Sequence, residues 1–133
     1  MIVLDASVAV RWFVAEEVGR EVALEILDRI QVSPESFAVP DLFYVEMLNV
    51  LSRMTSNAKD LQRYVRGLFD LGLVQIRVGS KLLDRASVIA FENKISGYDA
   101  LYVAVAESLS GTWLTGDIRA HNKIKNLSLS RVI

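Results

Sequence analysis

Short apolar segments alternate with amphipathic helical segments from one end of the 133-residue chain to the other. The first of them, residues 2–4, is apolar and largely β-branched, as in a buried strand, and a helix-compatible stretch follows it at once. Strands that are too short and too apolar to face water predict a parallel sheet covered by helices on both faces. The sequence therefore predicts an α/β fold: a three-layer α/β/α sandwich with a short, mainly parallel five-stranded sheet.

The boundaries of the expected elements follow from hydrophobic periodicity and from turn residues. Strands are expected at residues 2–4, 37–39, 74–78, 112–115 and 127–132, and helices at residues 18–30, 42–54, 58–71, 81–93, 98–109 and 117–124. Asp41 directly precedes one of these helices, where aspartate is a preferred cap. The two prolines lie at element edges, and no repeat or linker interrupts the chain. We expect residues 1–133 to form a single domain.

The composition excludes several classes of protein. The chain has no cysteine, which rules out disulfide frameworks, thiolate zinc sites and cysteine nucleophiles, and favours a reducing cytoplasm. No basic leader opens the sequence, and the longest uninterrupted apolar run, residues 100–106, is too short to span a bilayer. The net charge of −1 excludes nucleic-acid binding by bulk charge alone, although residues 1–50 carry −6 and residues 51–133 carry +5. We expect a cytoplasmic protein without a membrane partner.

Two aspartates follow predicted strands. Asp5 comes directly after the first strand, and Asp117 comes one glycine after the strand at residues 112–115. The carboxyl ends of parallel strands meet at one edge of the sheet, where ligands bind in this fold class. The alternative is that each aspartate only caps the helix that follows it.

Two further acids lie on helices that are otherwise apolar. Glu46 is the only charged residue in residues 42–51, so it needs a paired cation, a metal ion or protonation, and something positive is expected beside it. The alternative is that Glu46, Asn49 and Arg53 form a stripe facing solvent. Asp99 opens a helix with no other carboxylate before Glu107. Its alternative role is structural, because a serine at position 96 and an acid at position 99 fit a capping box.

These four acids can converge on one cleft at the sheet edge. At about 5 Å and an effective dielectric constant near 20, each pair of carboxylates repels by roughly 3 kcal/mol. Such a cluster persists only if a cation lies among the acids or if some of them are protonated. Oxygen ligands without histidine or cysteine favour Mg²⁺ or Mn²⁺, with one or two ions per site, and such ions serve phosphoryl chemistry.

Four segments together resemble one known family. They read VLDASVAV, VPDLFYVEMLNVL, SGYDALYVAVAE and LTGD, and they occur in the family's order over nearly the whole chain. The chain resembles PIN-domain ribonucleases, and more closely the VapC-type toxins of toxin–antitoxin pairs. The resemblance implies an acidic metal quartet with accompanying polar positions: Asp5, Glu46, Asp99 and Asp117, with Ser7, Asn49 and Thr115. It also implies the family's parallel-sheet sandwich, a homodimer, an RNA substrate, and a cognate antitoxin that lays a segment across the cleft.

An acidic nuclease has to bind RNA through local positive charge. Residues 119–131 contain four basic side chains and no acid, directly after Asp117. Arg11, Arg119 and Lys123 are the candidate phosphate contacts, and ordinary surface charge is the alternative for each of them. His121, the only histidine, is expected at the surface. The aromatic residues Trp12, Phe13, Phe43 and Tyr98 are expected to pack in the core or in a dimer rather than to stack on bases.

The expected activity is hydrolysis of RNA phosphodiesters to 5′-phosphate and 3′-hydroxyl ends with Mg²⁺ or Mn²⁺. The main alternative is an inactive binding or dimerisation module, in which the acids only cap helices. A haloacid-dehalogenase-like phosphatase is disfavoured, because that pattern needs a second acid where Ser7 stands.

Overall fold

The computed structural model describes residues 1–15 and 17–133. Five parallel strands form one sheet in the order β3-β2-β1-β4-β5. The strands are β1 (Ile2–Leu4), β2 (Phe37–Pro40), β3 (Val74–Ile76), β4 (Thr112–Thr115) and β5 (Ser130–Val132). The predicted α/β/α architecture with a five-stranded parallel sheet is confirmed.

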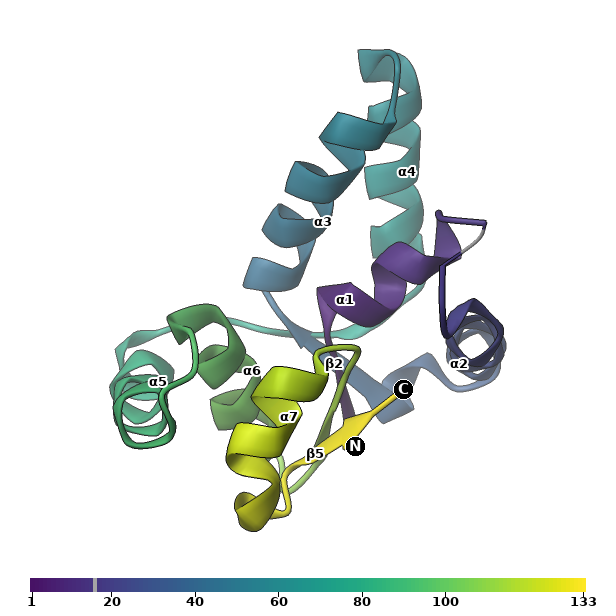
Figure 1. The fold of residues 1–133 in the computed structure, drawn as a ribbon. Coiled ribbons are helices and arrows are strands. Elements are labelled where there is room, and N and C mark those ends of the chain that lie inside the picture. Colours follow the sequence, from purple (N-terminus) through teal and green to yellow (C-terminus); the bar gives the residue numbers. More distant parts are fainter. Residues whose placement is uncertain (16) are drawn as a thin grey trace.

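Seven α-helices connect and cover these strands within the described residues. They are α1 (Ala6–Ala9), α2 (Arg20–Val32), α3 (Leu42–Met54), α4 (Ala58–Asp70), α5 (Ser80–Asn93), α6 (Gly97–Ser108) and α7 (Ile118–Ile124). Short 3-10 turns occupy Val10–Trp12, Pro34–Ser36 and Lys125–Leu127. Figure 1 shows α5, α6 and α7 on one side of the sheet and α2 on the other, while α3 and α4 form a hairpin that projects from the body.

Helix α6 is the most buried helix of the fold. Residues 100–106 are all buried, because α6 lies between the sheet and α5 (Figure 1). A helix covered on both sides can be apolar around its whole circumference, which explains the alanine-rich sequence. None of the helices among the described residues combines the length and the apolar character that a membrane span requires.

The strand order reverses between β1 and β4. After β1 the chain builds β2 and β3 on one side, and it then returns to place β4 and β5 on the other side. In the register of this central pair, Leu4 lies opposite Leu114. Asp5 and Thr115 therefore leave their strands side by side, at the switch point where parallel sheets bind ligands.

Several predicted bounds are off by one or two residues: the strand expected at residues 74–78 ends at Ile76, and the helix expected at residues 18–30 spans Arg20–Val32. Two further local predictions were wrong. The last strand does not begin at residue 127, because Lys125–Leu127 forms a 3-10 turn and Ser128 has a left-handed backbone with φ 56°. The strand begins only at Ser130. The Asp41 side chain does not cap α3: its backbone is already helical, and Oδ2 accepts a hydrogen bond of 3.3 Å from the Val78 amide. Asp41 thus connects the start of α3 to the segment after β3.

Candidate active site at the sheet edge

Asp5 is held by hydrogen bonds to both of its carboxylate oxygens. The residue is only 6% exposed. Oδ1 accepts a hydrogen bond of 3.0 Å from the Ser7 amide, and Oδ2 accepts one of 2.8 Å from the Thr115 hydroxyl. The first bond caps α1, so the capping interpretation of Asp5 is confirmed. The second bond follows from the β1–β4 register and fixes the carboxylate at the sheet edge.

Thr115 and Ser7 tie the Asp117 loop to Asp5. The Thr115 hydroxyl, which is fully buried, also accepts a hydrogen bond of 3.0 Å from the Asp117 amide. The Ser7 hydroxyl accepts one of 2.9 Å from the Gly116 amide. Asp117 itself caps α7, because its Oδ1 accepts from the Ala120 amide at 3.0 Å. Capping occupies one oxygen of Asp117, and the side chain is otherwise exposed to solvent.

The partner of Glu46 is a neutral group. The Tyr102 hydroxyl donates a hydrogen bond of 2.8 Å to Glu46 Oε1, which connects α6 to α3. No basic side chain pairs with Glu46 among the described residues, whose two salt bridges join Arg63 to Asp60 and Arg85 to Glu107. The expectation of a metal ion or a proton at Glu46 stays a prediction. Tyr102 was not predicted from the sequence, although its spacing of three residues from Asp99 places both on one helix face.

Asp99 lies in the first turn of α6. Its amide donates a hydrogen bond of 3.1 Å to the Ser96 hydroxyl, which caps the helix. This is half of the predicted capping box. Within residues 1–15 and 17–133 no reciprocal bond joins the Asp99 carboxylate to the Ser96 amide. The Ser96 side chain instead acts on the Asp99 carboxylate, where hydrogen bonding opposes the burial that raises the pKa of Asp99.

The pKa values of three of these acids are raised. Burial is the main cause for Asp5, Glu46 and Asp99. Burial together with the charges of Asp5 and Asp117 raises the pKa of Asp99 to about 6. The charges of Asp5 and Asp99 act in the same way on Glu46. Each of the four acids thus lies within electrostatic range of at least one other, with Asp99 coupled to both Asp5 and Asp117.

This donor set fits a hard divalent cation in type and charge. The available ligand atoms are carboxylate oxygens, and hydroxyl oxygens lie beside them, which is the chemistry that Mg²⁺ and Mn²⁺ prefer. As the side chains stand, no three acidic, histidine or cysteine residues in the described part of the chain are close enough together to hold an ion. The raised pKa values show that negative charge at this edge is unfavourable without a cation.

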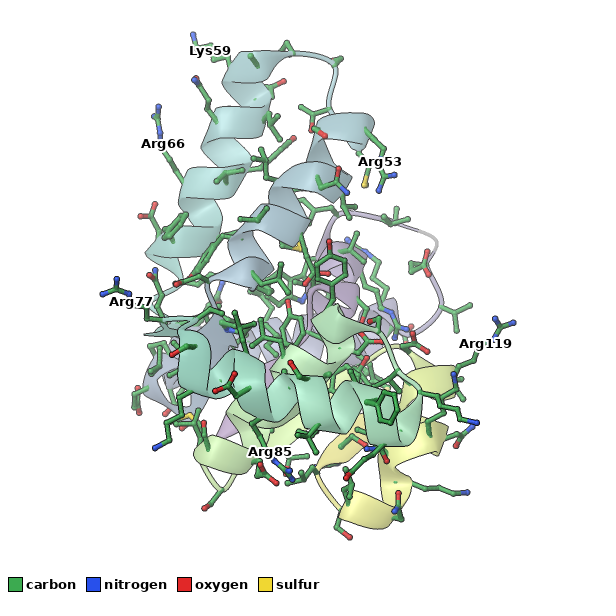
Figure 2. All side chains as sticks on the ribbon, turned by 90° about the vertical axis from the view of Figure 1, so that its left-hand side faces the viewer. Arg53, Lys59, Arg66, Arg77, Arg85 and Arg119 are labelled. Atoms are coloured by element: carbon green, nitrogen blue, oxygen red, sulfur yellow. The ribbon has the colours of Figure 1, made fainter. Side chains whose placement is uncertain are left out.

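The other predicted site residues differ in their surroundings. Asn49 is exposed, and its side chain makes no hydrogen bond within the described residues. Arg11 is half-buried: it donates a hydrogen bond of 3.1 Å to the Ile133 backbone oxygen, and its guanidinium packs against Gly116. Arg119 is exposed and extends into solvent (Figure 2). Lys123 is also exposed, and it donates to the Lys94 backbone oxygen at 2.9 Å.

The histidine and the aromatic side chains have mainly structural surroundings. The His121 ring lies 2.8 Å from the Ser130 hydroxyl, a partner that the sequence did not reveal. The indole of Trp12 donates to the Ala23 backbone oxygen, and Phe43 is fully buried. Tyr98 differs from these, because it is 65% exposed beside Asp99.

The family model of the PIN domain matches residues 2–126. The chain belongs to the PIN-domain family. No curated protein matches its sequence. Solved structures with the same fold include a toxin–antitoxin complex from Klebsiella pneumoniae, with 14% identity and a TM-score of 0.73, where the match covers 99% of this chain and 97% of the other. A second is the Mycobacterium tuberculosis toxin VapC20, which cleaves the sarcin–ricin loop, with 16% identity, a TM-score of 0.71, and coverage of 92% and 94%. A third is FitAcB from Neisseria gonorrhoeae, with 16% identity, a TM-score of 0.65, and 94% coverage of each chain.

Proposed function

We propose that this PIN-domain protein is a divalent-metal-dependent endoribonuclease and the VapC-type toxin of a toxin–antitoxin pair. The main support is electrostatic: the charges of Asp5 and Asp117 act on Asp99, and those of Asp5 and Asp99 act on Glu46, near the switch point of the sheet. Family membership and the fold shared with VapC20 support a nuclease. The proposed reaction is hydrolysis of an RNA phosphodiester to 5′-phosphate and 3′-hydroxyl ends.

In this proposal Asp5, Glu46, Asp99 and Asp117 hold Mg²⁺ or Mn²⁺. When bound, the ion lowers the pKa of a coordinated water and stabilises negative charge on the phosphate. Asp5 enters the site pre-oriented, because the Ser7 amide and the Thr115 hydroxyl already fix its two oxygens. The exposed oxygens of Asp117 lie on the solvent side, which suits the approach of a large substrate.

Positive side chains beside the acids are proposed to bind the RNA backbone. Arg119 follows Asp117 by two residues, and Arg53 follows Glu46 by two helical turns on the same face of α3. Both project toward the same side of the molecule in Figure 2, whereas Lys59, Arg66 and Arg77 project toward the opposite side. Contacts of this kind position a strand without reading its sequence.

We also propose a cognate antitoxin and a second copy of the chain as partners, in the cytoplasm. The neighbouring toxin–antitoxin complex supports the first of these. An apolar groove of about 550 Å³ between the start of α3, the start of α5 and the start of α6 offers a surface for a protein partner. Val45 and Tyr98, which line this groove together, are 62% and 65% exposed.

Analysis of the product ends tests the proposed reaction. The purified chain is incubated with a short single-stranded RNA and Mn²⁺, and the termini are identified by end labelling. We expect 5′-phosphate ends from the wild type, no cleavage by Asp99→Asn, and wild-type cleavage by Asp84→Asn, whose carboxyl is exposed on α5. Products with 2′,3′-cyclic phosphates would refute the mechanism, because the RNA's own 2′-hydroxyl forms them.

One observation favours an inactive binding module instead. The Asp5 and Asp117 carboxylates and the Ser96 hydroxyl before Asp99 each cap a helix, so capping alone can explain part of the acidic pattern. Metal binding separates the two functions. The nuclease proposal expects millimolar Mn²⁺ to raise the melting temperature of the wild type, since a ligand that binds only the folded state stabilises it. An unchanged melting temperature would favour the module.

A further inference from the structure

We infer that Tyr102 is a positioning residue that orients the Glu46 carboxylate toward the divalent ion. The inference rests on the proposed metal site. It concerns a residue that lies outside the acidic quartet and that the chain supplies from α6.

Packing on all sides holds the Tyr102 side chain in one position. The residue is 1% exposed, and its ring stacks at 6.3 Å on the fully buried ring of Trp113 from β4. A buried phenol hydroxyl requires a hydrogen-bond partner. The partner is Glu46 Oε1, at 2.8 Å. Because the ring is held in the core, the hydroxyl is a fixed point and the more mobile carboxylate adjusts to it.

The hydroxyl acts as a donor to Glu46 across the neutral pH range. A phenol carries its proton at neutral pH and an ionised carboxylate only accepts, so the 2.8 Å hydrogen bond runs from the Tyr102 hydroxyl to Glu46.

Helix geometry adds a second ligand, Asp99, to this arrangement. Tyr102 follows Asp99 by three residues, so both side chains lie on the same face of α6. The helix contributes Asp99 directly and holds Glu46 through Tyr102. The Tyr102 bond occupies Oε1 of Glu46 and leaves Oε2 for the ion. A glutamate that is already oriented loses less rotamer freedom when the ion binds.

Metal affinity, measured by titration of the purified full chain with Mn²⁺, tests this role. Tyr102→Phe retains the ring and removes only the hydroxyl. Loss of a partner that orients a metal ligand typically lowers metal affinity 10- to 100-fold. We expect a loss in this range, together with a lower kcat at fixed Mn²⁺ and an unchanged KM for RNA.

Tyr44→Phe is the matched control. Tyr44 is also buried, and its hydroxyl accepts a long hydrogen bond of 3.4 Å from the Gln75 side chain, away from the four acids. We expect wild-type Mn²⁺ affinity from this variant. An equal loss of affinity in both variants would overturn the inference, because it would show a general effect of removing a buried hydroxyl.

A double-mutant cycle with Glu46→Gln separates positioning from a purely structural role. If Tyr102 acts through Glu46, then Tyr102→Phe should not weaken Mn²⁺ binding further in the Glu46→Gln background. Additive losses would contradict the inference, as would a Tyr102→Phe chain with wild-type affinity or one that fails to fold. A wild type that binds no Mn²⁺ would refute the proposed function as well, so the two failures are distinguishable.

Discussion

Replacing Thr115 by valine removes one hydroxyl from the centre of the site without changing the volume of the core. This hydroxyl is fully buried, donates to Asp5 Oδ2 at 2.8 Å, and accepts from the Asp117 amide at 3.0 Å. Valine has nearly the same shape, so no cavity term enters. The variant leaves a buried carboxylate oxygen and a backbone amide without their partners.

The cost of Thr115→Val can be worked out from these two bonds. A hydrogen bond to a charged group contributes about 1.5–3 kcal/mol, and a neutral one contributes about 1 kcal/mol. We therefore expect the free energy of unfolding to fall by about 3 kcal/mol in metal-free buffer at pH 8. With an m-value of about 1.5 kcal/mol/M, the urea midpoint should fall by about 2 M.

Urea titration followed by circular dichroism measures this shift. Thr112→Val is the matched control, because Thr112 begins the same strand and its side chain makes no hydrogen bond in the described part of the chain. We expect the control to change the free energy of unfolding by less than about 0.5 kcal/mol. A Thr115→Val chain as stable as the control would refute the hydrogen-bond network around Asp5.

Three further predictions concern pH, RNA binding and backbone conformation. Since the folded pKa of Asp99 is raised from 3.8 to about 6, its protonated form is favoured by folding, so metal-free stability should fall as the pH rises from about 4 to 7. Asp99→Asn should remove up to about 3 kcal/mol of this pH-dependent loss in the free energy of unfolding, as measured by urea titration at each pH. An unchanged pH profile would contradict the assignment. In fluorescence anisotropy, Arg119→Glu should weaken RNA binding and reduce its salt dependence. Arg66→Glu, on the opposite side of the molecule, should leave both unchanged. An equal loss of RNA affinity in the two variants would exclude a local contact at Arg119. Gly19→Ala should destabilise the chain by about 1–2 kcal/mol, because the backbone of Gly19 has φ +82°. Gly67→Ala, inside α4, should stabilise the chain by about 0.5–1 kcal/mol. Thermal unfolding measures both changes, and the reverse order of melting temperatures would refute this reasoning.

The sequence determined most of the fold because the elements have strong local signals. The helix at residues 42–54 and the strands at residues 2–4 and 112–115 have the predicted bounds. The error after residue 127 arose because leucines at positions 127 and 129 resemble a strand, whereas the left-handed Ser128 interrupts it. A left-handed serine has no clear signal in a single sequence.

The sequence predicted which acids form the candidate site, but it did not predict the side chains that hydrogen-bond to them. Asp5 and Asp117 could be placed because each follows a strand, and parallel strands share an edge. Tyr102 could not be distinguished from a core aromatic residue within an apolar helix. Only the packing of α3 near α6 brings its hydroxyl to Glu46, and that contact joins residues 56 positions apart. The same packing gives Glu46 a neutral hydrogen-bond donor, which its sequence neighbours do not reveal.

The central claim is that four carboxylates from separate segments bind a divalent ion together. Crystals of the wild-type chain soaked in Mn²⁺ test this claim directly through anomalous scattering. We predict an anomalous peak surrounded by the oxygens of Asp5, Glu46, Asp99 and Asp117. A fully soaked crystal with no peak at this edge of the sheet, or with ions only elsewhere on the surface, would contradict it.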